Sequence, residues 1–255
     1  MHTLTPERTA LPVIGSGIPV IDGITGIGGY PRGRITELFG TASSGRSSLA
    51  LACCLQAAGT GHTVIWIDLE HSLGVKLPVD LAPSAQNILL LMPECAEDAV
   101  DMASLFLERS DVDLMVLDSA IVMHPSRRQE GVPLNMARAE MVGRALRKLT
   151  TLTARRNAVL LFLSRSYAMA APASDASIGG SALRCFASLR IRLVQEDLHL
   201  DENEPFCYAV RARVVKNKLA APYKEALLYY SVLDGRLMEE SPARVAEQDE
   251  EESWR

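Results

Sequence analysis

The chain has 255 residues, of which 48% are hydrophobic, 5% aromatic and 22% charged, and its formal net charge is −5. That length allows one large core, and no apolar run approaches the roughly 20 residues that span a bilayer. The first ten residues lack the charged-then-apolar pattern of a secretory signal. We therefore expect a cytoplasmic protein without membrane association.

Charge is distributed unevenly along the chain. Residues 239–255 carry seven acidic side chains against two arginines, which accounts for the whole net charge. We expect them to form an acidic, disordered tail, because low hydrophobicity with high charge prevents core formation. Residues 127–156 hold eight basic side chains against Glu130 and Glu140. This basic segment can contact nucleic acid phosphates, an acidic protein, or only solvent.

Predicted strands and helices alternate along most of the chain. In chain order we predict strands at 35–39, 63–68, 87–91, 114–118 and 159–164, with helices at 46–58, 96–109 and 135–156. Residues 167–180 are rich in Ala, Ser, Pro and Gly and predict a mobile loop. Strands at 189–194, 208–216 and 224–232 have the alternation of antiparallel additions. The pattern indicates an α/β fold with a mostly parallel, twisted sheet covered by helices on both faces.

Residues 39–49 have the pattern of a phosphate-binding loop. That pattern is Gly, four residues, Gly, Lys, then Ser or Thr. Gly40, Gly45 and Ser47 fit it, whereas Arg46 stands in the lysine position. A predicted strand precedes the loop and a helix follows, so unpaired helix amides would face a bound anion. The alternative is a Gly/Ser-rich turn between a strand and a helix.

Two acids lie at the ends of predicted parallel strands. Glu70 follows strand 63–68, and Asp118 ends strand 114–118. The carboxyl ends of parallel strands face the ligand crevice of such a sheet. Glu70 can position an attacking water beside a terminal phosphate, or serve only as a cap or a solvent-facing group. Asp118 has the place of a Walker B acid, which orders Mg²⁺.

Five short segments resemble the bacterial RecA recombinases, in that family's order and close to its spacing. They are residues 28–34, 67–71, 146–149, 178–183 and 214–222. The resemblance extends over about residues 15–232 and implies a RecA-like P-loop core with antiparallel edge strands. We place this core at residues 15–238, between an N-terminal extension at 1–14 and the acidic tail at 239–255.

The resemblance implies an ATP and Mg²⁺ site. Ser47 and Asp118 would hold Mg²⁺, and Glu70 would activate water. Lys216 and Lys218 match lysines that reach the nucleotide of the neighbouring subunit in the family's filament. The full set of predicted nucleotide contacts is Gly40, Ser43, Ser44, Gly45, Arg46, Ser47, Ser48, Asp118, Lys216 and Lys218.

The resemblance also implies contacts with single-stranded DNA. Residues 125–138 and 165–180 match the two loops that line the family's DNA channel. The predicted DNA-binding residues are Arg127, Arg128, Arg138, Arg144, Arg147, Lys148, Arg165, Gly179 and Gly180.

Several departures from the family pattern affect the nucleotide site. A guanidinium at Arg46 is bulkier than an ammonium and does not act as a compact point charge. Losing one electrostatic stabiliser costs on the order of 10² to 10³ in turnover. Arg165 stands where the family has a glutamine that senses the terminal phosphate. The segment at residues 73–77 is shorter than its counterpart in the family and lacks the aromatic side chain that covers adenine there. We expect ATP and Mg²⁺ binding to be weak or absent, and ATPase activity to be very weak or absent.

Three functions are compatible with these residues. The first is a non-catalytic or weakly catalytic accessory protein of the DNA damage response that binds DNA, a RecA filament or a translesion polymerase complex. It would resemble the ImuA proteins, which act in damage-induced (SOS) translesion synthesis and also lack the family's N-terminal helix and C-terminal domain. The second is an active DNA-dependent ATPase and recombinase. The third is a regulator that caps RecA filaments through Lys216 and Lys218. The changes at the nucleotide site favour the first function.

Overall fold

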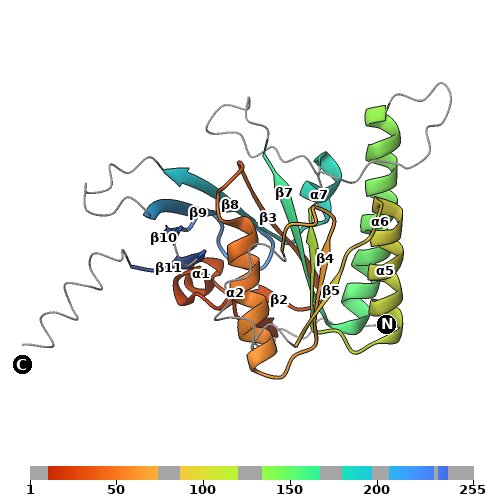
Figure 1. Cartoon of the computed structure of the whole chain (residues 1–255), viewed down its shortest axis with the longest axis horizontal. Coiled ribbons are helices and arrows are strands. Elements are labelled where there is room, and N and C mark those ends of the chain that lie inside the picture. Colours follow the sequence, from red (N-terminus) through yellow and green to blue (C-terminus); the bar gives the residue numbers. More distant parts are fainter. Residues whose placement is uncertain are drawn as a thin grey trace, which may run out of the picture.

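The computed structural model describes residues 11–73, 87–119, 134–166, 180–196, 207–232 and 235–240. Two layers of helices enclose one large sheet (Figure 1). The elements are β1 (Val13–Ile14), α1 (Pro19–Thr25), β2 (Tyr30–Pro31), β3 (Arg34–Gly40), α2 (Arg46–Gly59), β4 (Val64–Asp68), β5 (Ile88–Leu91), α5 (Ala96–Arg109), β6 (Leu114–Asp118), α6 (Leu134–Arg156), β7 (Val159–Arg165), α7 (Gly180–Phe186), β8 (Leu189–Glu196), β9 (Cys207–Asn217), β10 (Glu225–Ser231) and β11 (Arg236–Met238).

The large sheet has the strand order β11-β10-β9-β8-β3-β7-β6-β4-β5. Strands from β8 through β5 pair in parallel, whereas β8, β9, β10 and β11 pair antiparallel to one another. β3 is central, with β7 on one side and β8 on the other. The predicted α/β architecture with antiparallel edge strands is therefore confirmed.

Each face of the sheet has its own apolar core. One core packs α1 and α2 against the sheet, and the other packs α5, α6 and α7 against the opposite face (Figure 1). Small buried residues on α2, including Ala50, Cys53, Cys54 and Ala57, let that helix lie close to the strands. Cys53 and Cys54 thus serve as small packing residues of this core.

The longer predicted elements match the structure within one or two residues, but several short ones were not predicted. β1, α1, β2, α7 and β11 have two to seven residues each. Such lengths give too few turns or alternations for a periodic signal. The predicted loop at 167–180 ends where α7 begins, and residues 167–179 lie outside the described part of the chain. Glu239, where the predicted tail starts, accepts a hydrogen bond from the Val20 amide in α1 (2.5 Å).

A buried ion pair joins three neighbouring strands at the centre of the sheet. The Glu37 carboxylate on β3 accepts hydrogen bonds from the Arg190 guanidinium on β8 and the Ser164 hydroxyl on β7. Glu37 is fully buried, Arg190 is 2% exposed, and the Arg190 guanidinium lies 4.4 Å from the Phe39 ring centroid. Because a buried charge without its partner is costly, this cluster favours one strand order and register.

Among the helices of the described residues, none is long and apolar enough to cross a membrane.

Candidate nucleotide-binding site

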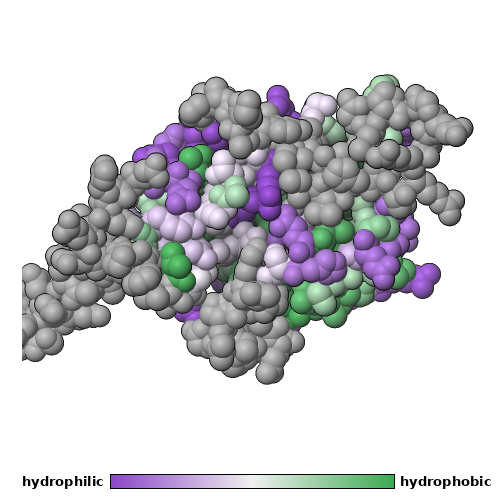
Figure 2. Space-filling model, turned by 45° about the horizontal axis from the view of Figure 1, so that its top comes forward, coloured by the Kyte–Doolittle hydropathy of each residue, from purple (hydrophilic) through white to green (hydrophobic). Residues whose placement is uncertain are grey.

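A cavity of about 640 Å³ opens where β3 ends and the phosphate loop leads into α2. It lies at the carboxyl edge of the parallel strands. In the turned view of Figure 2, hydrophilic side chains lie near the middle of the visible face. The cavity is lined by Ala42, Ser43, Ser44, Gly45, Arg46, Ser47, Ser48, Glu70, Arg165, Gln195, Tyr208, Tyr230 and Val232.

The two loop glycines are required by the backbone geometry. A Cβ on Gly40 would lie 2.2 Å from the Leu193 carbonyl oxygen and 2.5 Å from the Ser44 hydroxyl. Gly45 precedes α2 with a φ of +80°, in the left-handed region that favours glycine. The loop therefore turns tightly and presents the first amides of α2, which is the geometry that a bound phosphate requires.

Ser47 and Asp118 lie together, as the sequence predicts for a magnesium site. The Ser47 hydroxyl in the first turn of α2 donates to Asp118 Oδ2 at the end of β6, with an Oγ–Oδ2 distance of 3.0 Å. A hydroxyl and a carboxylate at this separation are oxygen ligands of the kind that Mg²⁺ prefers.

Glu70 is held at the cavity by a turn that the Asp68 carboxylate organises. Asp68 accepts hydrogen bonds from the amides of Glu70, Ser72 and Leu73 at 2.8–3.1 Å. The Asp68 side chain thus fixes the turn, which brings Glu70 into the wall of the cavity.

Both carboxylate oxygens of Glu70 are engaged within the protein. The Ser119 hydroxyl donates to Oε1, and Arg165 Nη2 lies 3.7 Å from Oε2. The pair is possible because β7, which ends at Arg165, is separated from β4 only by β6. The Ser119 hydroxyl and the Arg165 guanidinium therefore compete with a water molecule for the Glu70 carboxylate.

The positively charged Arg46 lines the same cavity. Burial lowers the pKa of the Arg46 guanidinium, and the nearby carboxylates of Asp118 and Glu70 act in the opposite direction. An arginine side chain nonetheless stays charged in proteins. Within the described part of the chain, the buried Nε atoms of Arg46 and Arg165 and the buried Ser44 hydroxyl have no hydrogen-bond partner. The hydrogen-bonding capacity of these donors is thus unused among the described residues.

Four lining residues were not predicted from the sequence. Tyr208, Tyr230, Gln195 and Val232 come from β9, β10, β8 and the turn after β10. The Tyr208 hydroxyl donates to the Ser43 carbonyl oxygen (2.8 Å), and burial raises the pKa of Tyr208 to about 12, so the hydroxyl keeps its proton. Only strand pairing brings these residues to the loop, and no local motif could have identified them.

Lys216 and Lys218 lie at the other end of the sheet. The register pairs Asn217 with Leu189 and Leu189 with Thr36, near the beginning of β3, whereas the phosphate loop follows its end. Lys216 donates to the carbonyl oxygens of Arg184 and Cys185, and Lys218 donates to that of Cys185 (3.1 Å). Burial and the charge of Lys218 lower the pKa of Lys216. The structure does not bring the two lysines to this chain's own phosphate loop.

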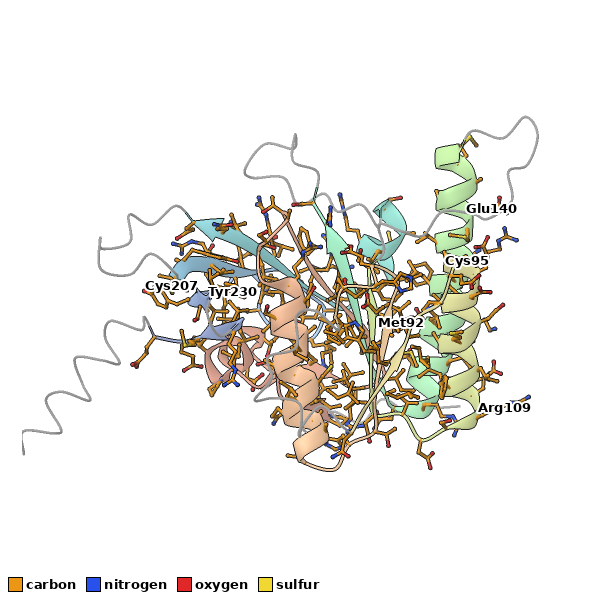
Figure 3. All side chains as sticks on the ribbon, in the orientation of Figure 1. Met92, Cys95, Arg109, Glu140, Cys207 and Tyr230 are labelled. Carbon is orange, nitrogen blue, oxygen red and sulfur yellow. The ribbon has the colours of Figure 1, made fainter. Side chains whose placement is uncertain are left out.

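The basic segment is described only over α6. Arg147 and Lys148 are exposed, Arg144 forms an exposed ion pair with Glu140 (3.7 Å), and Arg156 donates to the Glu108 carbonyl oxygen. Glu140 and Arg109 mark the outer sides of α6 and α5 in Figure 3. The predicted DNA residues Arg127, Arg128 and Gly179 lie outside the described residues, as does the side chain of Arg138, and Gly180 begins α7.

The residues present fit a nucleoside phosphate with Mg²⁺. The loop supplies amides and the unpartnered Ser44 hydroxyl, two arginines supply positive charge, and Ser47 with Asp118 supplies oxygen ligands. No cluster of three or more His, Cys, Asp or Glu side chains suited to a metal occurs in the described ranges.

Comparison with known proteins gives consistent matches. A family model of the RecA N-terminal domain matches residues 1–235. The chain is 32% identical over 227 residues to Protein RecA of Nitratidesulfovibrio vulgaris strain DP4, covering 86% of this chain and 64% of that protein. It is 31% identical over 227 residues to Protein RecA of Francisella tularensis subsp. novicida, covering 85% of this chain and 62% of that protein.

The fold is also similar to a solved structure. The crystal structure of the RadB recombinase superposes with a TM-score of 0.67 at 16% identity, covering 90% of this chain and all of that chain.

The chain spans about 64% of the length of the first curated relative that it matches.

Proposed function

Because the chain belongs to the RecA family, we propose that it is an accessory protein that binds ATP with Mg²⁺ at the phosphate-loop cavity and turns ATP over weakly or not at all. The observation that carries this proposal is the engagement of both Glu70 oxygens, by the Ser119 hydroxyl and the Arg165 guanidinium. Glu70 is the candidate water-activating group, and it lies in the same cavity as the phosphate loop.

The protein's own groups would divide the binding task. Amides of the loop and the first turn of α2 would contact phosphate oxygens, with the Ser44 hydroxyl and Arg46 beside them. Ser47 and Asp118 would hold Mg²⁺, which when bound neutralises phosphate charge. Arg46 gives a planar, bidentate contact where a lysine would give a point charge, so affinity for phosphate is retained better than turnover.

In this accessory role, the protein would act together with a partner in the DNA damage response. Either a RecA filament or a translesion polymerase complex would be that partner, and the ImuA proteins are the group that this combination of departures resembles. The described residues form a complete phosphate-loop cavity beside an ion pair on the candidate water-activating Glu70, and this combination supports a binding role over catalysis. An active DNA-dependent recombinase is the less favoured alternative, because Arg46 and the Arg165–Glu70 pair oppose turnover.

A second candidate function is regulation of RecA filaments. Lys216 and Lys218 lie together beside the last turn of α7. They are at the end of the strands opposite the phosphate loop. Both can therefore contact an adjoining molecule without involving this chain's cavity. This arrangement supports a protein that caps a filament end through the two lysines.

Affinity capture tests the partner. We expect full-length protein, incubated with extracts of DNA-damaged cells, to retain a recombinase or a translesion polymerase more strongly with Mg-ATP than without nucleotide, as identified by mass spectrometry. Polymerase subunits in the bound fraction support the translesion role, and recombinase alone supports filament regulation. Retention of neither, with and without nucleotide, would contradict the accessory role.

DNA binding through α6 has its own test. We expect Arg147→Ala with Lys148→Ala to weaken single-stranded DNA binding and to flatten its salt dependence, because each lost phosphate contact removes about 0.7 from the slope of log affinity against log salt. Two contacts correspond to a change of about 1.4. The measurement is fluorescence anisotropy over a salt series.

Arg109→Ala is the control. Arg109 is exposed at the end of α5, and its replacement removes a positive charge outside the predicted DNA surface. It should leave the slope near that of the unaltered protein. An unchanged slope in the α6 double variant would exclude this helix as a phosphate-binding surface.

A further inference from the structure

Two neighbouring helices carry opposite charge on their exposed sides. α5 and α6 lie side by side on one face of the sheet, and Arg156 in the last turn of α6 donates to the Glu108 carbonyl oxygen near the end of α5 (Figure 1). The exposed acids of α5 are Asp98, Asp101 and Glu108. The exposed bases among the described side chains of α6 are Arg144, Arg147, Lys148, Arg155 and Arg156. Arg109 on α5 and Glu140 on α6, both labelled in Figure 3, are the charges of the other sign.

Each set of charges follows one side of its helix. Positions 98, 101, 105 and 108 of α5 recur every three or four residues, which places them on one helix face. Leu105, at the middle of that face, is 46% exposed. We call these four residues the acidic stripe. Exposed residues of α6 recur with the same spacing, and we call them the basic stripe: Arg144, Arg147, Lys148, Thr151 and Arg155.

Most of these charges have no partner of opposite sign within the chain. Among the described residues, the three acids of the acidic stripe form no ion pair. In the basic stripe, Arg144 lies 3.7 Å from Glu140 in an exposed pair, which contributes little. The charges of the two stripes are therefore available to a second molecule that presents the opposite pattern, and another copy of this chain presents both patterns.

The two stripes match in length when one of them is reversed. At 1.5 Å per residue, Asp98 and Glu108 are about 15 Å apart along α5, and Arg144 and Arg155 are about 17 Å apart along α6. A twofold axis perpendicular to the helices would set α5 of one copy antiparallel to α6 of the other. Glu108 would then lie opposite Arg144 of the partner subunit, and Asp98 opposite Arg155 of the partner subunit. Such a contact occurs twice and closes with two copies.

We propose that this chain forms a symmetric dimer in which the acidic stripe of each copy packs on the basic stripe of the other. Leu105 lies near the middle of the contact, and the charges surround it, in the arrangement of an apolar centre with a polar rim. Rim charges give specificity and salt dependence more than affinity. The inference goes beyond the proposed function. It also implies that DNA and the second copy compete for Arg147 and Lys148.

Sedimentation of the full chain over a salt series tests the dimer. We expect dimers at about 0.1 M salt and a dissociation constant that rises at least about tenfold by about 1 M, because the screening length of exposed charges falls from about 10 Å to about 3 Å over that range. Analytical ultracentrifugation at several protein concentrations measures the constant.

Charge reversal makes the test independent of folding defects. Asp101→Lys with Glu108→Lys, and separately Arg144→Glu with Lys148→Glu, should each give monomers at about 0.1 M salt, because like charges then face each other. An equimolar mixture of the two variants should restore dimers that contain one copy of each, a gain that misfolded protein cannot produce. Lys224→Glu, at an exposed lysine just before β10, is the control and should dimerise like the unaltered protein.

Each other outcome counts against the stripes as a dimer contact. Monomers of the unaltered protein at every salt concentration would overturn the dimer, and loss of single-stranded DNA binding in the basic-stripe variant of such a monomer would assign the stripe to nucleic acid alone. Dimers that persist in either double variant, or the absence of dimers in the mixture, would overturn the pairing of the stripes. These results do not depend on nucleotide binding, so the dimer and the proposed function can fail separately.

Discussion

The double substitution Arg46→Lys with Arg165→Gln is expected to raise ATP turnover on the order of 10²-fold, whereas Arg46→Lys alone leaves it near the rate of the unaltered protein. Lysine restores a compact charge at the phosphate loop, but Arg165 remains against Glu70 in the single variant. Glutamine at position 165 removes that ion pair and frees one oxygen of Glu70. Restoring an electrostatic stabiliser is worth on the order of 10² to 10³ in rate.

Steady-state phosphate release with Mg-ATP measures this effect. Adding Glu70→Gln to the double variant should abolish the gain, because the carboxylate would no longer accept a proton. Arg155→Gln, an exposed arginine on α6, is the matched control for lost charge and should not change the rate. Recovery of full turnover by Arg46→Lys alone would show that the Arg165–Glu70 pair has no inhibitory effect.

Replacing Glu37 by Ala is expected to lower the free energy of unfolding by about 3–5 kcal/mol, the cost of leaving one charge of a buried pair without its partner. Glu37 is fully buried, and its carboxylate accepts from Arg190 and Ser164. Removing it takes the carboxylate of this ion pair away from the buried Arg190 guanidinium on β8. Urea unfolding followed by far-ultraviolet circular dichroism measures the change.

Glu225→Ala provides the control, because Glu225 pairs with Arg211 and Arg213 at the surface of β9 and β10. Exposed pairs contribute about 0–1 kcal/mol, so this variant should unfold almost like the unaltered protein. If Glu37→Ala costs no more than Glu225→Ala, the buried pair does not stabilise the centre of the sheet.

The sequence predicts the architecture well where apolar runs are long. The strand at 114–118 and the helix at 96–109 coincide with β6 and α5, because a buried strand and an amphipathic helix have clear periodicity. The RecA-like fold class is confirmed by the family match and by the similarity to the RadB structure. The division into an extension, a core and a tail stays a prediction, although β1 (Val13–Ile14) lies within the first of these.

The site is predictable only where it is local in sequence. Gly40, Gly45 and Ser47 lie within eight consecutive positions, so a motif identifies them. The Arg165–Glu70 pair depends on the order β7-β6-β4, and the Tyr208–Tyr230 pair depends on the register of β9 and β10. Neither order nor register can be read from the chain alone. The roles predicted for Arg165 and Glu70 accordingly stay predictions, now with a defined contact between them.

The most direct test of nucleotide binding without efficient turnover is to measure both on one sample of the unaltered protein. Calorimetric titration with Mg-ATP gives the affinity, and phosphate release from the same mixture gives the rate. We predict saturable binding with one nucleotide per chain, lost in Ser47→Ala with Asp118→Asn, and a rate on the order of 10²-fold below that of the Arg46→Lys, Arg165→Gln variant. Turnover by the unaltered protein that equals the rate of that variant, or the absence of any saturable binding, would contradict the account.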